Sequence, residues 1–339
     1  MPGHDIITVG ASAGGVEALA ELAARLPGDL PASVFVALHV PSHGSSVLPR
    51  ILSRRGPLPA RHAEDGEPVV PGRIYVAPPD HHLLIHRRAV RLSRGPRENG
   101  VRPAVDPLFR SAARWYGPRV VGVVLSGALD DGSAGLSAIK GRGGIAVVQD
   151  PADALFAGMP RHAIEAVAVD HVLPVAGIPT LLDGLARQEA AGEGGGGLVD
   201  EIGTGVADFD LDAIRRDHRP GTPLGFACPD CAGVLREIQD GDLVRYRCRV
   251  GHAWSPTGLL AEQSDALGTA LRTAFRALEE RAALAARMAD RFRSQGRDSV
   301  AARFVSQARA ARGRSALIRR VLMEEEPDAE PAGPGDEPG

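Results

Sequence analysis

Short runs of β-branched and apolar residues alternate with stretches of helical apolar spacing over the first 190 residues. The apolar runs are IITVG, SVFVALHV, RIYVAP, VVGVVLS, IAVVQD and HVLPV. Apolar residues three and four apart mark helices in GVEALAELAARL, DPLFRSAARWY, SAGLSAIKGRG and GIPTLLDGLARQEA. Such alternation is typical of a parallel sheet covered on both faces. We therefore predict an α/β fold, a doubly wound, mostly parallel sheet in three α/β/α layers, with LLIHRRAVRLSR as an inserted hairpin.

The glycine-rich stretch EAAGEGGGGLVDEIGTG ends this pattern. Its low apolar content cannot supply a core, so we interpret it as a flexible linker. A cysteine cluster and two long helical patterns follow, and Gly296 is positioned to end the first helix before Ser299 caps the second. The predicted segments are an α/β domain (1–190), a linker (191–222), a zinc-ribbon-like module (223–256), a helical hairpin (257–323) and a disordered acidic tail (324–339).

Composition excludes several classes of protein. The net charge of −3, from 39 basic and 42 acidic residues, is too balanced to indicate a polyanion partner such as nucleic acid for the whole chain. No apolar run reaches the roughly 20 residues that cross a bilayer, so no membrane insertion is expected. The N-terminus lacks the pattern of a signal peptide, which predicts a cytoplasmic protein.

The first apolar run leads into GASAGG, a glycine turn with one hydroxyl at Ser12. Glycines that open a helix after a strand often expose backbone N–H groups to a phosphate. The dinucleotide fingerprint G-x-G-x-x-G fits poorly, because Ser12 takes the middle glycine position and the second run ends at His39 instead of an acid. A P-loop fits poorly too, because Lys140 is the only lysine in the chain and lies far from this turn.

Gly10, Ser12 and Gly14 match G-x-S-x-G, in which a tight strand-to-helix turn lifts the serine hydroxyl above the edge of the sheet. Backbone N–H groups at the start of the following helix, such as that of Ala13, are placed to stabilise the oxyanion of a tetrahedral intermediate. A serine hydroxyl is a weak nucleophile, so it needs a base within hydrogen-bond reach and a third group that orients the base.

Candidates for the base and the acid follow neighbouring strands. His39 closes the second apolar run, and Asp130 and Asp131 come just past VVGVVLS. Ligands of open parallel sheets bind at the carboxyl ends of the strands, so these side chains are expected near Ser12. The residues alone leave two alternatives open. One is that His39 is only a polar residue at the end of a strand. The other is that either aspartate is the orienting acid, because Asp-Gly pairs are common in turns.

Six motifs occur in order along residues 4–185: GASAGG, HVP, AEDGEPVVPGRIYVAPPDHH, RPAVDPLF, GVVLSGALDDGSAG and QDPADALFAGMPRHA. Together they resemble the catalytic domain of the chemotaxis protein-glutamate methylesterases, the CheB type. The resemblance implies a Ser-His-Asp triad, with Ser12 as nucleophile and His39 as general base and acid. It implies Asp131 as the orienting carboxylate, in preference to Asp130, because Asp131 directly precedes glycine.

The resemblance further implies hydrolysis of glutamate 5-O-methyl esters on a methylated chemoreceptor, with release of methanol and glutamine deamidation as a second activity. It implies no cofactor for catalysis, and as partners the receptor and a protein of the methyltransferase pathway. The residues themselves support acyl transfer to water, in which Ser12 forms an acyl-enzyme that water activated by His39 releases.

The chain departs from the family pattern in two places. Gly127, Ala128 and Leu129 stand where the family shows G-M-G, which bears on any oxyanion or wall contribution of that methionine. No receiver domain fits ahead of Ile6, so phosphorylation-gated control in cis is not expected. An alternative function is therefore a signalling adaptor whose esterase domain is weak or inactive and which binds receptor or partner proteins.

All three cysteines cluster with one histidine as C-x2-C, sixteen residues, then C-x3-H. Cys228, Cys231, Cys248 and His252 have zinc-ribbon-like spacing, and a hairpin turned at Asp240–Gly241 would join the two halves. Four ligands close the coordination shell, which favours structural zinc on which catalysis does not depend. A small domain with reduced thiols is the alternative.

The two C-terminal helical patterns are strongly basic, with thirteen arginines against five acidic residues in 265–323. An apolar stripe recurs near helical spacing at Leu267, Leu271, Leu278, Ala282 and Phe292. We expect a helical hairpin that buries this stripe on itself, and a docking platform for a receptor helix or an acidic partner is the alternative.

Overall fold

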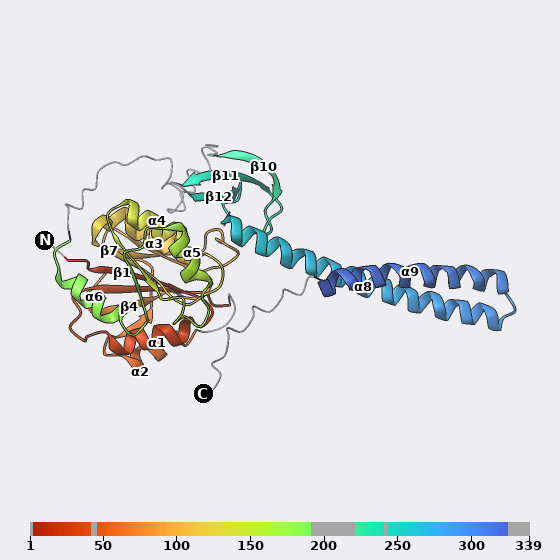
Figure 1. Ribbon diagram of the computed structural model, residues 1–339, viewed down its shortest axis with the longest axis horizontal. Helices are drawn as coiled ribbons and strands as arrows, with labels where there is room; N and C mark the ends of the chain where they lie inside the picture. The colour runs from red at the N-terminus through yellow and green to blue at the C-terminus, as the bar shows by residue number, and fades with distance from the viewer. Residues whose placement is uncertain (1–2, 42–45, 191–220, 241–242, 325–339) are drawn as a thin grey trace, which may run out of the picture. The chain divides into compact units, whose positions relative to one another are not determined.

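The computed structural model describes residues 3–41, 46–190, 221–240 and 243–324 (Figure 1). The chain divides into two compact units, Met1–Leu259 and Leu260–Gly339. Almost all of the predicted linker and all but the first residue of the predicted tail lie outside the described residues. None of the helices in the described ranges combines the length and the apolar character that crossing a bilayer requires.

The α/β part of the first unit follows the predicted alternation of strands and helices. Its elements are β1 (Ile6–Ala11), α1 (Gly15–Arg25), β2 (Ser33–Leu38), α2 (Leu48–Arg55), β3 (Ala60–His62), β4 (Arg73–Val76), β5 (His82–His86), β6 (Ala89–Ser93), α3 (Val105–Tyr116), η1 (Gly117–Arg119), β7 (Val120–Val124), α4 (Ser133–Gly141), β8 (Ile145–Gln149), α5 (Gly158–Ala166), β9 (His171–Leu173) and α6 (Ile178–Arg187).

Seven strands form one sheet in the order β3-β4-β2-β1-β7-β8-β9, and every pairing in it is parallel. The prediction of a doubly wound parallel sheet is confirmed. The chain winds outward from β1 through β2 in one direction and from β7 through β8 in the other, so the order reverses between β1 and β7. The carboxyl ends of strands on either side of such a reversal form the usual binding crevice of open α/β sheets.

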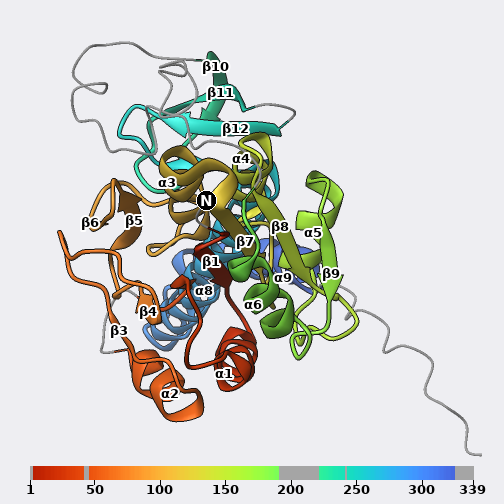
Figure 2. The same ribbon diagram turned by 90° about the vertical axis from the view of Figure 1, so that its left-hand side faces the viewer.

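Helices cover both faces of this sheet (Figure 2). Helices α1, α2 and α6 pack on one face, in a core that includes Val9, Leu19 and Leu182. Helices α3, α4 and α5 and the β5–β6 hairpin pack on the other, in a core that includes Phe35 and Phe109. Because both faces are buried, the strands are continuous apolar runs instead of alternating ones.

Three elements of this domain, besides the short 3-10 helix η1, were not predicted, and the hairpin lies outside the main sheet. Helix α2 is short and arginine-rich with only three buried residues, β3 has three residues, and α5 is short with a glycine and a proline in its first turn, so none shows clear periodicity. Strands β5 and β6 form a separate two-stranded sheet beside α3 and are not hydrogen-bonded into the main sheet.

The rest of the first unit is a small antiparallel sheet of β10 (Thr222–Ala227), β11 (Val234–Asp240), β12 (Leu243–Cys248) and β13 (Ala253–Trp254). We call residues 222–254 the ribbon. Its core consists of Leu235, Trp254 and two of the cysteines, joined by Leu259 of α8 (Pro256–Ser294), with Tyr246 packed against it. Strands β11 and β12 pair antiparallel, as expected for the hairpin predicted between the two halves of the ribbon. Residues 241–242 between them lie outside the described residues.

The second unit contains most of α8 (Pro256–Ser294) and all of α9 (Asp298–Glu324), which form the predicted hairpin. Gly296, with φ of 70°, makes the turn, and α9 begins at Asp298, one residue before the expected cap. Of the predicted stripe, Ala282 is buried, Leu271, Leu278 and Phe292 are half-buried, and only Leu267 is exposed, at 51%. Small residues let the helix backbones approach closely, and the buried ones include Ala282, Ala285, Ala289, Ala301, Ala308, Ala311 and Ser315.

Candidate active site and metal cluster

Ser12 lies in the turn between β1 and α1, at the carboxyl edge of the sheet. Its N–H donates to the carbonyl of Ser126, which follows β7, at 2.9 Å, and its carbonyl accepts from Gly15 N–H at 2.9 Å. Gly14 has φ of 69°, in the left-handed region that glycine adopts without strain. The predicted G-x-S-x-G turn is therefore anchored to both strands at the reversal of the sheet order.

His39 follows β2, the neighbour of β1, and its ring lies between Ser12 and Asp131. The Nδ1 atom is 3.0 Å from Ser12 Oγ, and Nε2 is 2.7 Å from Asp131 Oδ2. The contact with Asp131 assigns the tautomer of His39. A carboxylate can only accept a hydrogen bond, so the ring proton lies on Nε2. Nδ1 is then free to accept the proton of the serine hydroxyl. The chymotrypsin template uses the two ring nitrogens the other way round.

Asp131 lies in the loop between β7 and α4, and the start of helix α3 holds its carboxylate. The N–H of Val105 donates to Oδ2 at 2.7 Å and that of Asp106 to Oδ1 at 3.2 Å. Although burial opposes ionisation, the hydrogen bonds from His39 and these two N–H groups hold the pKa of Asp131 below its ordinary value. Asp131 is therefore an ionised carboxylate whose orientation three groups determine, His39 and the N–H groups of Val105 and Asp106.

Asp130, the alternative acid from the sequence, contacts a different residue. Its Oδ1 accepts a hydrogen bond from Ser255 Oγ at 2.7 Å. Burial raises the pKa of Asp130 above its ordinary value, against the hydrogen bond from Ser255. Of the two neighbouring aspartates, Asp131 alone has its carboxylate within hydrogen-bond distance of the imidazole.

A methionine lies beside Ser12, although not at the family position between Gly127 and Leu129. A Cβ added at Gly127 would lie 2.1 Å from Met159 Sδ and 2.9 Å from Ser12 Cβ, so only glycine fits there. Met159 is fully buried on α5, and its N–H donates to the Gly127 carbonyl at 2.8 Å. The wall next to the serine is thus built by Gly127 and Met159.

Two neighbours of the site were not identified from the sequence. Asp106 lies behind Asp131 in the first turn of α3, where its Oδ1 accepts from Gly132 N–H at 3.1 Å and Gly135 N–H at 2.6 Å. Ser255 precedes a proline at the start of α8, the pattern of a helix cap, so the sequence carried a signal for its local role. Nothing in the sequence indicated that Ser255 contacts Asp130.

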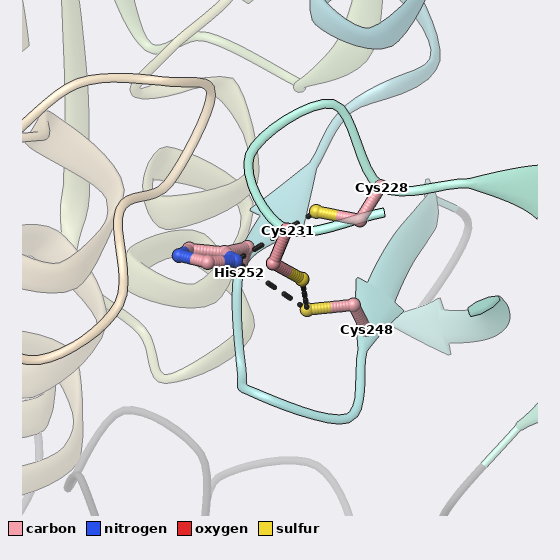
Figure 3. A group of neighbouring side chains, drawn as sticks. All are labelled: Cys228, Cys231, Cys248 and His252. Atoms are coloured by element: carbon pink, nitrogen blue, oxygen red, sulfur yellow. Dashed lines mark hydrogen bonds between the residues drawn. The ribbon is translucent and has the colours of Figure 1, made fainter. Parts of the chain in front are cut away.

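The four predicted metal ligands come together in the ribbon (Figure 3). One ligand atom from each of Cys228, Cys231, Cys248 and His252 lies within 4.8 Å of the others. Cys231 Sγ is 3.5 Å from Cys248 Sγ, and His252 Nδ1 is 3.7 Å from Cys228 Sγ and 3.5 Å from Cys248 Sγ. This cluster could hold a metal ion, and its sulfur atoms are too far apart for a disulfide.

With this geometry established, comparison with known proteins identifies the family. The family model for the CheB methylesterase matches residues 7–182. The chain belongs to the CheB methylesterase family. The matched part holds Ser12, His39 and Asp131, whereas the ribbon and the helical hairpin lie outside it. The resemblance inferred from the six motifs is confirmed.

Similar proteins are named protein-glutamate methylesterases. The "Protein-glutamate methylesterase/protein-glutamine glutaminase 5" of Anaeromyxobacter dehalogenans is 44% identical over 186 residues, 54% of this chain and 51% of that protein. A Pyrococcus horikoshii protein-glutamate methylesterase/protein-glutamine glutaminase is 36% identical over 183 residues, 53% of this chain and 50% of that protein. The chain thus spans about half the length of these two relatives.

A solved structure shares the fold of the matched part. The Thermotoga maritima CheB methylesterase catalytic domain is 35% identical, with a TM-score of 0.52, and the match covers 53% of this chain and 98% of that domain. The α/β part of the first unit therefore has the fold of a CheB catalytic domain.

Proposed function

We propose that this chain is a serine esterase that hydrolyses glutamate 5-O-methyl esters on a methylated chemoreceptor or receptor-like protein and releases methanol. The observation that carries the proposal is the hydrogen-bonded series from Ser12 through His39 to Asp131, at the carboxyl edge of the sheet of a CheB-family domain. Deamidation of glutamine is the second activity, because an amide carbonyl can undergo the same acyl transfer.

In the first half of the reaction, Ser12 Oγ attacks the ester carbonyl and His39 Nδ1 takes the hydroxyl proton. The tetrahedral intermediate collapses when the imidazolium returns this proton to the methoxide, which leaves as methanol. The product is a glutamyl ester of Ser12. The Ala13 N–H, at the entry to α1, is our proposed donor to the oxyanion.

In the second half, water replaces methanol. His39 Nδ1 removes a proton from the water as it attacks the acyl-enzyme, and the same imidazolium then returns the proton to Ser12 Oγ. Asp131 stays ionised throughout and stabilises the imidazolium across the 2.7 Å contact with Nε2. The reaction therefore needs no metal or organic cofactor for its chemistry.

The test is methanol release from a methylated receptor fragment by the full chain, compared with Ser12→Ala. We expect the wild type to release methanol and the variant to release at least about a thousandfold less per unit time. Equal rates would remove the esterase proposal and favour the alternative, an adaptor that binds methylated receptor without hydrolysing it. Binding of the fragment by both proteins distinguishes an inactive adaptor from a protein that does not recognise the receptor.

We propose further that the ribbon binds one structural zinc ion through Cys228, Cys231, Cys248 and His252. Tetrahedral zinc with bonds of about 2.3 Å to sulfur and about 2.0 Å to nitrogen requires ligand atoms about 3.5 to 3.8 Å apart. The separations of 3.5, 3.5 and 3.7 Å fit this requirement. Because four protein ligands close the shell, the ion would supply folding energy to the ribbon and no reaction step.

We also propose the partners, the cellular location and the segments of the chain. The receptor and a methyltransferase-pathway protein would be the partners in the cytoplasm, without nucleic acid or membrane insertion. Residues 1–190 would form the esterase domain, and residues 223–256 and 257–323 a metal-binding module and a helical hairpin. The linker 191–222 and the acidic tail 324–339 stay predictions from composition.

A further inference from the structure

The ribbon contacts the α/β domain at residues that adjoin the proposed triad. Ser255, directly after β13, donates its hydroxyl to Asp130 Oδ1 at 2.7 Å, and Asp130 precedes Asp131 in the chain. The N–H of Ser255 donates to Asn99 Oδ1 at 2.8 Å. One residue at the end of the ribbon therefore touches both the loop that carries the proposed acid and the loop before α3.

Ser255 also caps helix α8. Its Oγ accepts from Gly258 N–H at 2.9 Å while it donates to Asp130, so one hydroxyl serves both contacts. A Cβ at Gly258 would lie 2.9 Å from Ser255 Oγ and 3.1 Å from Asn99 Oδ1, which shows how closely these groups pack. The position of the Asp130 carboxylate is therefore tied to the first turn of a helix.

A second contact is ionic and buried. Glu98, almost fully buried, accepts from Arg110 of α3 at 2.6 and 2.7 Å and from Arg245 of β12 at 2.7 Å, and Arg247 lies 3.6 Å away. A buried carboxylate is costly unless cations neutralise it. Arg245 of β12 thus adds a second charged hydrogen bond to Glu98, whose other donor, Arg110, belongs to the helix whose first N–H groups bind Asp131.

The metal ligands lie next to both contacts. Ala253 N–H donates to the Arg97 carbonyl at 3.2 Å, and Asn99 N–H donates to the Ala253 carbonyl at 2.8 Å, so residues 97–99 extend the ribbon sheet. His252 directly precedes Ala253, and Cys248 directly follows Arg247. An ion held by His252 and Cys248 would therefore fix the two strands that contact the α/β domain.

We propose that the metal-bound ribbon positions the loop that carries Asp131, through Ser255 on Asp130 and the β12 arginines on Glu98. The inference rests on the proposed esterase function and assigns the metal no chemical step. It differs from the sequence-based expectation, which remains untested, that catalysis does not need the metal. Loss of the ion frees both strands, lets the 127–132 loop move, and reduces the fraction of enzyme in which Asp131 orients His39.

Kinetics of full-chain variants test the contact at Ser255. Ser255→Ala is expected to lower kcat about tenfold with little change in KM, and Ser255→Thr, which keeps the hydroxyl, to restore it. In an Asp130→Ala background, Ser255→Ala should lower kcat no further, because the carboxylate that the hydroxyl contacts is gone and only the cap at Gly258 is lost. Full activity of Ser255→Ala, or full additivity of the two changes, would overturn this contact as a positioning device.

Arg245→Ala tests the second contact against Arg249→Ala, a matched loss of one arginine whose side chain is exposed in the same ribbon. The first is expected to lower kcat severalfold and the second to leave it unchanged. Equal effects of the two variants would show that the Glu98 contact does not position the site.

Hydrogen exchange of the full chain, zinc-loaded and after chelation, provides a readout that does not depend on activity. We expect chelation to increase exchange in peptides covering 97–110 and 127–133 and to leave helix α1 unchanged. Unchanged exchange in both peptides would overturn the inference. Absence of methanol release by the loaded wild type, together with the expected exchange pattern, would refute the proposed function and leave the positioning of the loop supported.

Discussion

Asp106, in the first turn of helix α3, donates its N–H to Oδ1 of Asp131, in the loop before α4, at 3.2 Å. The side chain of Asp106 turns back to accept from the N–H groups of Gly132 and Gly135, on either side of the start of α4. Two buried carboxyl groups thus occupy one site, and burial together with the charge of Asp131 raises the pKa of Asp106 to about 7.

The shift predicts a dependence of stability on pH. The folded protein binds the Asp106 proton more tightly than the unfolded chain, so the free energy of unfolding should fall as pH rises from about 4 to about 7. The charged groups around Asp106 are Asp131, Arg110, Arg245 and Glu98. Asp106→Asn keeps the acceptor for both glycines without the charge. The variant should gain stability relative to wild type, by up to a few kcal/mol, as pH rises through this window.

Urea unfolding at a series of pH values measures this difference. The two proteins should have similar stability near pH 4 and diverge toward pH 7. A difference that does not vary with pH would show that Asp106 is ionised throughout, as its neighbour Asp131 is.

His39→Ala should cost as much methylesterase activity as Ser12→Ala, at least about a thousandfold in kcat. The imidazole and the hydroxyl act as one unit across the 3.0 Å contact, so removing both should cost no more than removing either. Methanol release by the two single variants and the double variant measures this. Losses that multiply in the double variant would show that the two residues act independently.

Asp131→Asn should lower kcat about a thousandfold or more, because an amide facing Nε2 can donate to it and so favour the tautomer with the proton on Nδ1. Asp130→Asn is the matched control, since its oxygen can still accept from Ser255. We expect it to retain most activity in the same assay. A large loss of kcat in Asp130→Asn with a small loss in Asp131→Asn would instead identify Asp130 as the orienting acid.

Gly127→Ala should disturb both the fold and the site. The added methyl group would meet Met159 Sδ and Ser12 Cβ, and overpacking of this kind costs about 1 to 3 kcal/mol. Gly184→Ala, in helix α6 with no heavy atom within 4 Å of the added Cβ, should instead stabilise by about 0.5 to 1 kcal/mol. Thermal unfolding and methanol release measure both variants. If Gly127→Ala has wild-type thermal stability and methanol release, then Met159 and Ser12 can move to accommodate the added methyl group.

Purified reduced protein should contain about one zinc ion per chain by elemental analysis, and Cys231→Ser should lose it. Trp254 is buried in the ribbon core, so chelation should shift its fluorescence to longer wavelength as the ribbon unfolds. A Trp115→Phe background isolates this signal, because the chain has two tryptophans. Protein that is reduced, metal-free and still shows buried Trp254 would refute the zinc assignment.

The local order of the chain was readable from its sequence. The apolar runs predicted most strands of the main sheet, because a strand buried on both faces must be apolar throughout. The turn at Ser12 and the four metal-ligand candidates could be selected because each depends on residues close in sequence or on a rare residue type. Short elements such as α2 and β3 were missed, because they bury too little to show a period.

The tertiary structure decided the relationships between distant residues. Asp130 and Asp131 are equivalent in sequence terms, and resemblance to the family had to separate them. In the folded chain the start of α3 holds the carboxylate of Asp131 toward His39, while Ser255 takes Asp130. The seam of alanines and the burial of Glu98 against Arg245 likewise join segments far apart in the sequence. Sequence periodicity reports which face of an element is buried, and packing alone determines which residues meet there.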